Sequence, residues 1–67
     1  MIVLYTTNSS DCIKLEKELK QKNIKFFRVS DEDTIRAKGL GNSSFPVLEV
    51  EGIKMNYMTA SEWVNNQ

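Results

Sequence analysis

The spacing of apolar and polar positions changes several times along the chain and predicts the element order β-α-β-α-β-β-α. Residues 2–6 are apolar on both faces, as in a central strand that is covered on two sides. Residues 10–22 repeat apolar positions at helical spacing. The buried stripe of this helix is predicted to be Cys12, Leu15 and Leu19, widened by Ile13. The charged face is predicted to carry the ion pairs Glu16–Lys20 and Glu18–Lys22.

The remaining elements are delimited by cap and turn residues. Asn23 is expected to end the first helix in a left-handed conformation, before a strand over 24–29 with both sides covered. The segment 30–33 offers an N-cap and first-turn acids for a short helix that stops at Gly39. We prefer this cap to a metal site for the three acids. A hairpin follows over 47–50 and 53–56. A capping box over 59–62 predicts a terminal helix to about residue 66, with Trp63 in the core.

These elements predict a small α/β domain that spans residues 1–67. The first strand, helix and second strand form a βαβ unit, which requires a parallel, right-handed connection. The last two strands are joined by a two-residue turn and must be antiparallel. A mixed four-stranded sheet with helices on both faces is the simplest arrangement that satisfies both conditions.

Composition and charge narrow the function classes. Nine basic and nine acidic residues balance, which argues against an electrostatic nucleic-acid binder. No apolar run approaches the ~20 residues of a membrane span, and no basic leader precedes the first strand. One cysteine and no histidine exclude a disulfide framework and a zinc site of the usual N/S type within the chain. We expect a cytoplasmic monomer with no bound metal or cofactor, and with no membrane or nucleic-acid partner.

The candidate chemistry lies where the first strand meets the first helix. Cys12, the only cysteine, falls in the first helical turn. Amide N–H groups and the helix dipole stabilise a thiolate at such a position. The plainer interpretation of Cys12 is a small hydrophobic residue on the helix stripe, and that of Ser9 is an N-cap. Both interpretations stay open at this point.

Four segments in this order resemble the glutaredoxin-like proteins of the thioredoxin-fold superfamily. The segments are Leu4-Tyr5-Thr6-Thr7, Asn23-Ile24-Lys25-Phe26, Phe45-Pro46-Val47 and Glu62-Trp63-Val64. The resemblance spans essentially the whole chain. It implies a thioredoxin-like fold, a cis bond before Pro46, and disulfide reductase activity at a Cys-x-x-Cys site.

Residues 9–12 align with that Cys-x-x-Cys by resemblance, so the implied catalytic positions are Ser9 and Cys12. Ser9 stands where the family has its attacking cysteine, and Cys12 stands where it has the resolving cysteine. A serine hydroxyl is not ionised near neutral pH, and no base is visible for it. The chain as written should therefore not complete a dithiol cycle. Either Ser9 replaces a native active-site cysteine, or the protein has lost its nucleophile and keeps the fold as a binding module.

The resemblance also implies a set of substrate-binding positions. They are Tyr5, Ser10, Asp11, Phe45, Pro46, Tyr57 and Met58. The implied substrate is a glutathione-mixed disulfide or a protein disulfide, as in the hydrogen donors of ribonucleotide reductase, with glutathione as a candidate reductant. Residues 56–59 lack the glycine pair and acid that usually hold glutathione, and no basic side chain is expected beside the Cys-x-x-Cys position.

Two further hypotheses compete with the oxidoreductase. The chain is a non-catalytic interaction domain that binds a partner along the Pro46 edge, or Cys12 alone performs monothiol chemistry, including disulfide-linked dimers. The monothiol hypothesis requires Cys12 to be exposed.

Overall fold

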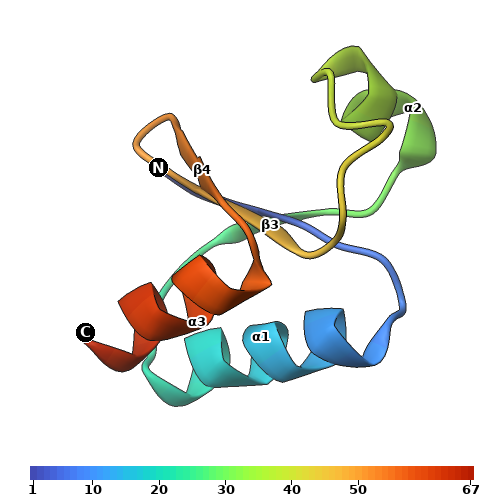
Figure 1. Ribbon diagram of the computed structural model, residues 1–67. Helices are drawn as coiled ribbons and strands as arrows, with labels where there is room; N and C mark the ends of the chain where they lie inside the picture. The colour runs from blue at the N-terminus through green and yellow to red at the C-terminus, as the bar shows by residue number, and fades with distance from the viewer.

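A computed structural model describes residues 1–67 and contains one sheet with the strand order β2-β1-β3-β4 (Figure 1). The strands are β1 (Ile2–Tyr5), β2 (Phe27–Val29), β3 (Val47–Val50) and β4 (Ile53–Met55). β1 runs parallel to β2 and antiparallel to β3, and β3 is antiparallel to β4. The helices are α1 (Ser10–Gln21), α2 (Glu32–Ala37) and α3 (Tyr57–Asn65). The predicted element order and the predicted mixed sheet are therefore both present.

Helices α1 and α3 lie side by side on one face of the sheet (Figure 1). Six apolar side chains between these helices and the sheet have no exposed surface. This α1–α3 cluster consists of Leu4, Leu15, Leu19, Leu48, Ala60 and Val64. Burying one leucine side chain contributes about 1.5–3 kcal/mol, so this layer accounts for much of the stability of the domain.

The other face of the sheet is covered less completely. Its α2 cluster consists of Val3, Tyr5, Ile35, Leu40 and Val47. Only Ile35 comes from α2 itself, which has six residues and lies toward one end of the sheet (Figure 1). β1 contributes alternate residues to the two clusters, as its period of two requires, and the prediction that both of its faces are covered is confirmed.

Helix α1 follows its predicted stripe with one exception. Cys12, Leu15 and Leu19 are buried, but Ile13 is 53% exposed and does not widen the stripe. The helix ends as predicted, since Asn23 has φ 57°. The N–H of Ile24 donates to the carbonyl of Leu19 at 3.0 Å, and the N–H of Asn23 donates to that of Lys20 at 3.0 Å. This pair of bonds is a Schellman motif.

Two predicted boundaries are wrong. The second strand begins at Phe27 rather than at residue 24. The prediction that both of its sides are covered is also wrong, because β2 lies at the edge of the sheet, where the six-residue helix α2 leaves Phe27 65% exposed. Helix α3 begins at Tyr57 rather than at Thr59. Its N-cap is Asn56, whose Oδ1 accepts a hydrogen bond from the Thr59 N–H at 2.9 Å. Asn56, predicted as the last strand residue, is thus the first cap residue.

Polar contacts join the helices in ways that are partly as predicted. Glu16 and Lys20 form the expected ion pair at 3.4 Å. Glu18 does not pair with Lys22, because its carboxylate accepts hydrogen bonds from α3 instead. The donors are Ser61 Oγ at 2.8 Å and Asn65 Nδ2 at 3.2 Å.

The short helix α2 begins as predicted, within the acidic segment. Its N-cap is Asp31, whose Oδ2 accepts from the Thr34 N–H at 2.9 Å and from Thr34 Oγ1 at 2.8 Å. These bonds to the carboxylate hold the pKa of Asp31 below its usual value. Asp31 thus satisfies a free N–H group at the beginning of α2.

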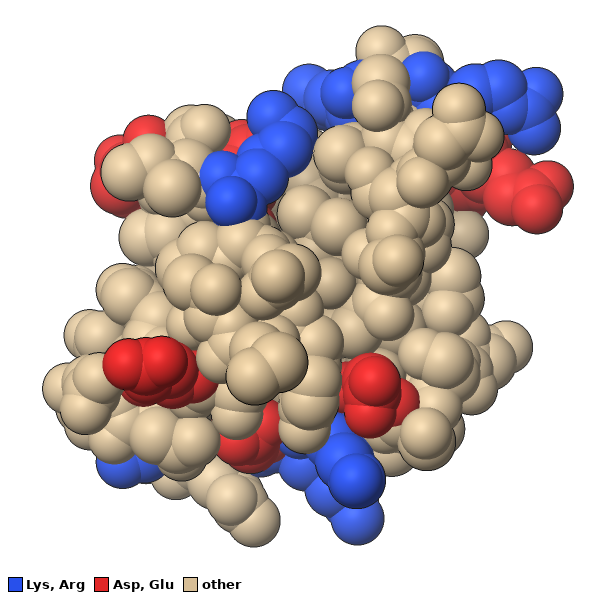
Figure 2. Space-filling model, in the orientation of Figure 1, with Lys and Arg blue, Asp and Glu red and all other residues tan.

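Charged side chains lie around the periphery of the face shown in Figure 2, and the middle of that face is uncharged. Basic side chains gather along the rim over α2, whereas acidic side chains are scattered. None of the three helices combines the length and apolar character that crossing a membrane requires.

Candidate active site

The site is built where β1 ends and α1 begins, over residues 6–12. Ser9 has φ −70° and ψ 161°, the extended conformation of an N-cap residue. Its Oγ accepts a hydrogen bond from the Cys12 N–H at 3.4 Å and so satisfies an amide that the helix leaves free. The N-cap interpretation of Ser9 is confirmed, and this cap fixes the side chain of Ser9 directly beside Cys12.

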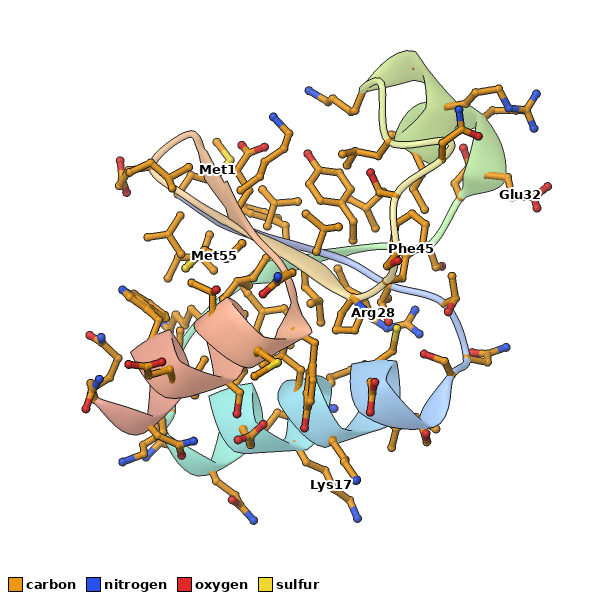
Figure 3. All side chains as sticks on the ribbon, in the orientation of Figure 1. Met1, Lys17, Arg28, Glu32, Phe45 and Met55 are labelled. Carbon is orange, nitrogen blue, oxygen red and sulfur yellow. The ribbon has the colours of Figure 1, made fainter.

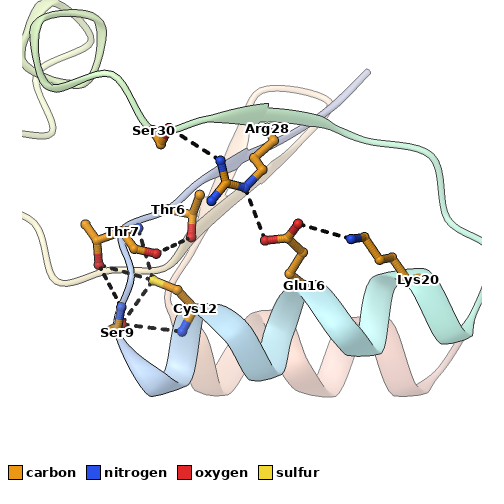
Figure 4. A network of polar contacts seen from close by, with 8 residues as sticks. All are labelled: Thr6, Thr7, Ser9, Cys12, Glu16, Lys20, Arg28 and Ser30. Carbon is orange, nitrogen blue, oxygen red and sulfur yellow. Dashed lines mark hydrogen bonds and ion pairs between the residues drawn. The ribbon is translucent and has the colours of Figure 1, made fainter.

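The Cys12 sulfur is fully buried and lies among hydrogen-bond donors (Figure 4). Ser9 Oγ donates to Sγ at 3.1 Å, and the Thr7 N–H donates to it at 3.3 Å. Thr7 Oγ1 lies 3.5 Å from the same sulfur. Cys12 is buried on the helix stripe, as the plainer interpretation predicts, and its sulfur also lies within hydrogen-bond distance of three polar groups.

These contacts alter the pKa of the Cys12 thiol. Burial raises that pKa because it disfavours the thiolate. The hydrogen bonds from Ser9, Thr6 and Thr7 act in the opposite direction because they stabilise the thiolate, and together they bring the pKa below its usual 9.0. The junction therefore stabilises a sulfur anion that solvent does not reach.

Burial of Cys12 contradicts the monothiol hypothesis. That hypothesis needs a thiol exposed to a substrate or to a second chain, and Cys12 has no exposed surface. Ser9, whose hydroxyl contacts the sulfur, is itself exposed at the surface.

The predicted substrate-binding residues fall into two groups. Ser10 and Asp11 are exposed in the first turn of α1, next to Ser9. Phe45 is half-buried and Pro46 is buried, and the peptide bond between them is cis, as the resemblance implies. Phe45 lines the same hollow as Thr7, so the segment before β3 and the turn before α1 border a common space.

The other three predicted residues lie elsewhere. Tyr5 is 2% exposed within the α2 cluster, and its OH lies 3.5 Å from Glu49 Oε1. Tyr57 packs against the α1–α3 cluster, and Met58, the next residue of α3, is 79% exposed. Substrate contact by Tyr5, Tyr57 and Met58 stays a prediction.

Arg36 is a residue that no motif or spacing in the sequence singles out. It lines the hollow of about 150 Å³ that Thr7 and Phe45 border, together with Ser30, Glu32 and Ile35. Arg36 thus shares a hollow with Thr7, but Ser9 and Cys12 do not line it, so the expectation that no basic side chain lies beside the Cys-x-x-Cys position stays a prediction. Arg36 is far from Cys12 in sequence, and only the packing of α2 against the sheet brings it there.

A second basic residue is held nearby by other groups. Arg28 Nε donates to Glu16 Oε1 at 3.2 Å, and Arg28 Nη1 donates to Ser30 Oγ at 3.4 Å (Figure 4). Glu16 also pairs with Lys20. Arg28 is thus committed to a polar network that ties β2 to α1, whereas Arg36 faces the hollow. Figure 3 shows Phe45 and Arg28 at the same end of the sheet, above the beginning of α1.

Comparison of the chain with protein-family models, with curated proteins and with solved structures finds no match. The interpretation of the site therefore depends on its geometry and on the motifs in the sequence.

Proposed function

We propose that this chain is a glutaredoxin-like protein of thioredoxin-like fold, with its disulfide site at residues 9–12 and serine at the attacking position. The observation that carries the proposal is the pairing of an exposed position 9 with a buried sulfur 3.1 Å away. A resolving thiol needs only to reach the sulfur at the attacking position, so burial does not disable it. The element order and the mixed sheet support the thioredoxin-like arrangement.

With cysteine at position 9, the chain can reduce a substrate disulfide in two thiol–disulfide exchange steps. The introduced thiolate attacks one sulfur of the substrate disulfide, forms a mixed disulfide and releases the other sulfur as a thiolate. The Cys12 thiolate then attacks the position-9 sulfur and releases the second substrate thiolate. The chain has lost two electrons and two protons to the substrate, and an external thiol such as glutathione restores it.

With serine at position 9, the first step cannot occur. The hydroxyl is not ionised near neutral pH, and its hydrogen bonds in the structure are to the Cys12 sulfur and amide rather than to a base. The chain as written binds disulfide substrates without turning them over. This makes it a single-thiol form of an oxidoreductase that acts in the reducing cytoplasm.

Arg36 supports a substrate with a carboxylate. Its guanidinium can form a bidentate pair with a terminal carboxylate in the hollow beside Phe45. A glutathione-mixed disulfide supplies such a group, and so does a protein disulfide near a chain end or an acidic residue, as in a ribonucleotide reductase partner. We place glutathione-mixed disulfides first, because a hollow of about 150 Å³ has room for a terminal group such as a carboxylate rather than for a folded partner surface.

The test is turnover by the Ser9→Cys variant. Reduction of a glutathionylated peptide and of insulin disulfides is followed with glutathione, glutathione reductase and NADPH. We expect turnover by Ser9→Cys and none by the unchanged chain or by Ser9→Ala. The added change Arg36→Gln should raise KM for the glutathionylated peptide and leave insulin reduction unaltered.

A folded Ser9→Cys variant that reduces neither substrate would contradict the proposal. The chain would then be a non-catalytic module that binds along the Pro46 edge. If Arg36→Gln leaves turnover and KM unchanged, only the proposed pairing of Arg36 with a substrate carboxylate is overturned.

A further inference from the structure

The outer edge of β2 is open. β2 is the last strand on its side of the sheet and pairs only with β1. The carbonyl of Val29 accepts from the Thr6 N–H, so Val29 and Phe27 direct their backbone groups toward β1. By alternation, Arg28 directs its backbone groups away from the sheet. Phe26 precedes β2, and neither residue takes part in the turn, loop or cap hydrogen bonds of the backbone. An added strand would find donors and acceptors there.

Apolar surface flanks this edge on both faces of the sheet. One hollow of about 570 Å³ is lined by Met1, Ile2, Ile24, Lys25, Phe26 and Phe27. A second hollow of about 330 Å³ is lined by Met1, Val3, Tyr5, Phe27, Val29, Thr34 and Lys38. Met1 and Phe27 border both hollows and are 72% and 65% exposed. The two hollows therefore form one apolar surface that wraps around the β2 edge.

Each hollow is lined by one lysine and by Met1, whose charged N-terminal amine pairs with Glu51. Lys25 lines the first and Lys38 lines the second, and no acidic residue lines either one. Neither lysine takes part in an ion pair within the chain. The surface thus offers apolar area, free backbone groups and two unpaired cations.

Charge decides which occupant fits. A second copy would bring the same two unpaired lysines to the contact, and because no acidic residue lines either hollow it would offer no opposite charge to pair with them. A segment that alternates apolar and acidic residues would instead place valine-like side chains on Met1 and Phe27 and carboxylates near the lysines.

We propose that the β2 edge binds an extended acidic-apolar segment of a partner protein as an added strand. This interaction goes beyond the disulfide site, which lies at the opposite end of β1. The parallel pairing of Val3 with Phe27 puts the edge surface beside the start of β1, whereas Thr6 and Thr7 follow its end. The partner can therefore dock without covering position 9.

The test is titration of the 15N-labelled chain with a short acetylated peptide of alternating glutamate and valine. We expect the amide signals of Phe26 and Arg28 to shift and their hydrogen exchange to slow. A matched peptide with lysine for glutamate should bind at least about tenfold more weakly at low salt. A peptide with proline in place of alternate valines should not bind, because it lacks the N–H groups that pair with the edge.

Variants of the chain locate the surface. The double change Lys25→Glu with Lys38→Glu should reverse the preference between the two peptides. Phe27→Thr keeps a strand-forming residue but removes exposed apolar area. It should lower the affinity of the chain for the glutamate peptide by about tenfold. Ser9→Cys should bind it as the unchanged chain does, which separates this proposal from the disulfide site.

Three results would overturn the proposal. They are equal binding of the glutamate and lysine peptides, signal shifts confined to the residues around Ser9 and Phe45, and sedimentation equilibrium that shows the chain alone to be a dimer that Phe27→Thr converts to a monomer.

Discussion

The two faces of the sheet differ in how completely they are buried. Every residue of the α1–α3 cluster has 0% exposure, whereas the residues of the α2 cluster retain 2–8%. Three hollows, of about 390, 330 and 150 Å³, are lined in part by members of the α2 cluster. The hollow of about 570 Å³ is lined in part by Ile2, Ile24 and Phe26, which pack against the α1–α3 cluster, but by none of the six residues of that cluster. The closed face holds the fold together. The open face, covered by a helix of six residues, leaves room for Arg36 and Lys38 at the surface.

Truncating one leucine on each face is the strongest test of this difference. Leu19 belongs to the α1–α3 cluster and Leu40 to the α2 cluster, so the chemical change is the same. Leu→Ala in a core costs about 2–5 kcal/mol, and less where the site can collapse or is partly open. We expect the loss of unfolding free energy to lie near the top of that range for Leu19→Ala and near the bottom for Leu40→Ala. Urea unfolding measures both losses.

The total stability of a chain this short is about 3–10 kcal/mol, so Leu19→Ala could leave no folded protein to measure. Leu19→Met, which keeps the volume, provides the milder control and should cost less than about 1.5 kcal/mol. If Leu40→Ala costs as much as Leu19→Ala, the two faces contribute equally and the comparison fails.

Cys12 differs from the rest of the closed face. It is as buried as the leucines there, but its sulfur accepts hydrogen bonds from polar groups. Its thiol pKa is lower in the folded chain than in the unfolded chain. As pH rises from the folded pKa toward the unfolded value of about 9.0, the unfolded chain binds more protons, so stability increases. The contribution is complete above that value and is lost as pH falls through the folded pKa.

The measurement is the free energy of unfolding of the unchanged chain minus that of Cys12→Ala, as a function of pH. Taking the difference cancels the other titrating groups. The difference should increase with pH just below 9.0. A difference that decreases over this range would mean that burial outweighs the hydrogen bonds from Ser9 and Thr7.

The smallest change in unfolding free energy is expected for Tyr5, which belongs to the α2 cluster on the open face. Burial raises the pKa of Tyr5, and the charge of Glu49 and its hydrogen bond raise it further. The bond is long, at 3.5 Å, so Tyr5→Phe should cost about 0.5 kcal/mol or less near neutral pH.

At high pH the sign for Tyr5 is the reverse of that for Cys12. Above about 10.0, the unfolded chain loses the tyrosine proton first, so stability falls as pH rises, and Tyr5→Phe should remove that decline. Unfolding free energies of both chains between neutral pH and pH above 10.0 check this. A loss of several kcal/mol at neutral pH would show that the hydroxyl is structurally essential.

Much of the fold could be predicted because local signals agree with it. The stripe of Cys12, Leu15 and Leu19 and the turn at Asn23 follow from spacing and residue type. The failures have tertiary causes. Ile13 is apolar but faces solvent, and Glu18 is drawn to Ser61 and Asn65 of α3 rather than to a lysine on its own helix.

The site was predictable only in part, for a similar reason. Ser9 and Cys12 are three residues apart, so helix geometry alone brings them together. Arg36 joins the hollow beside Phe45 because α2 packs against the sheet, and no spacing in the sequence encodes that approach. The two hollows at the β2 edge likewise combine residues from β1, β2 and α2.

Whether position 9 and Cys12 form a disulfide site can be tested without a substrate. Ser9→Cys is equilibrated with oxidised glutathione, and free thiols are counted by alkylation and mass spectrometry after unfolding. We expect loss of both thiols and of two hydrogens in mass, with no attached glutathione. Ser9→Cys that keeps both thiols free, or carries glutathione at position 9 with Cys12 unreacted, would overturn the assignment of this site.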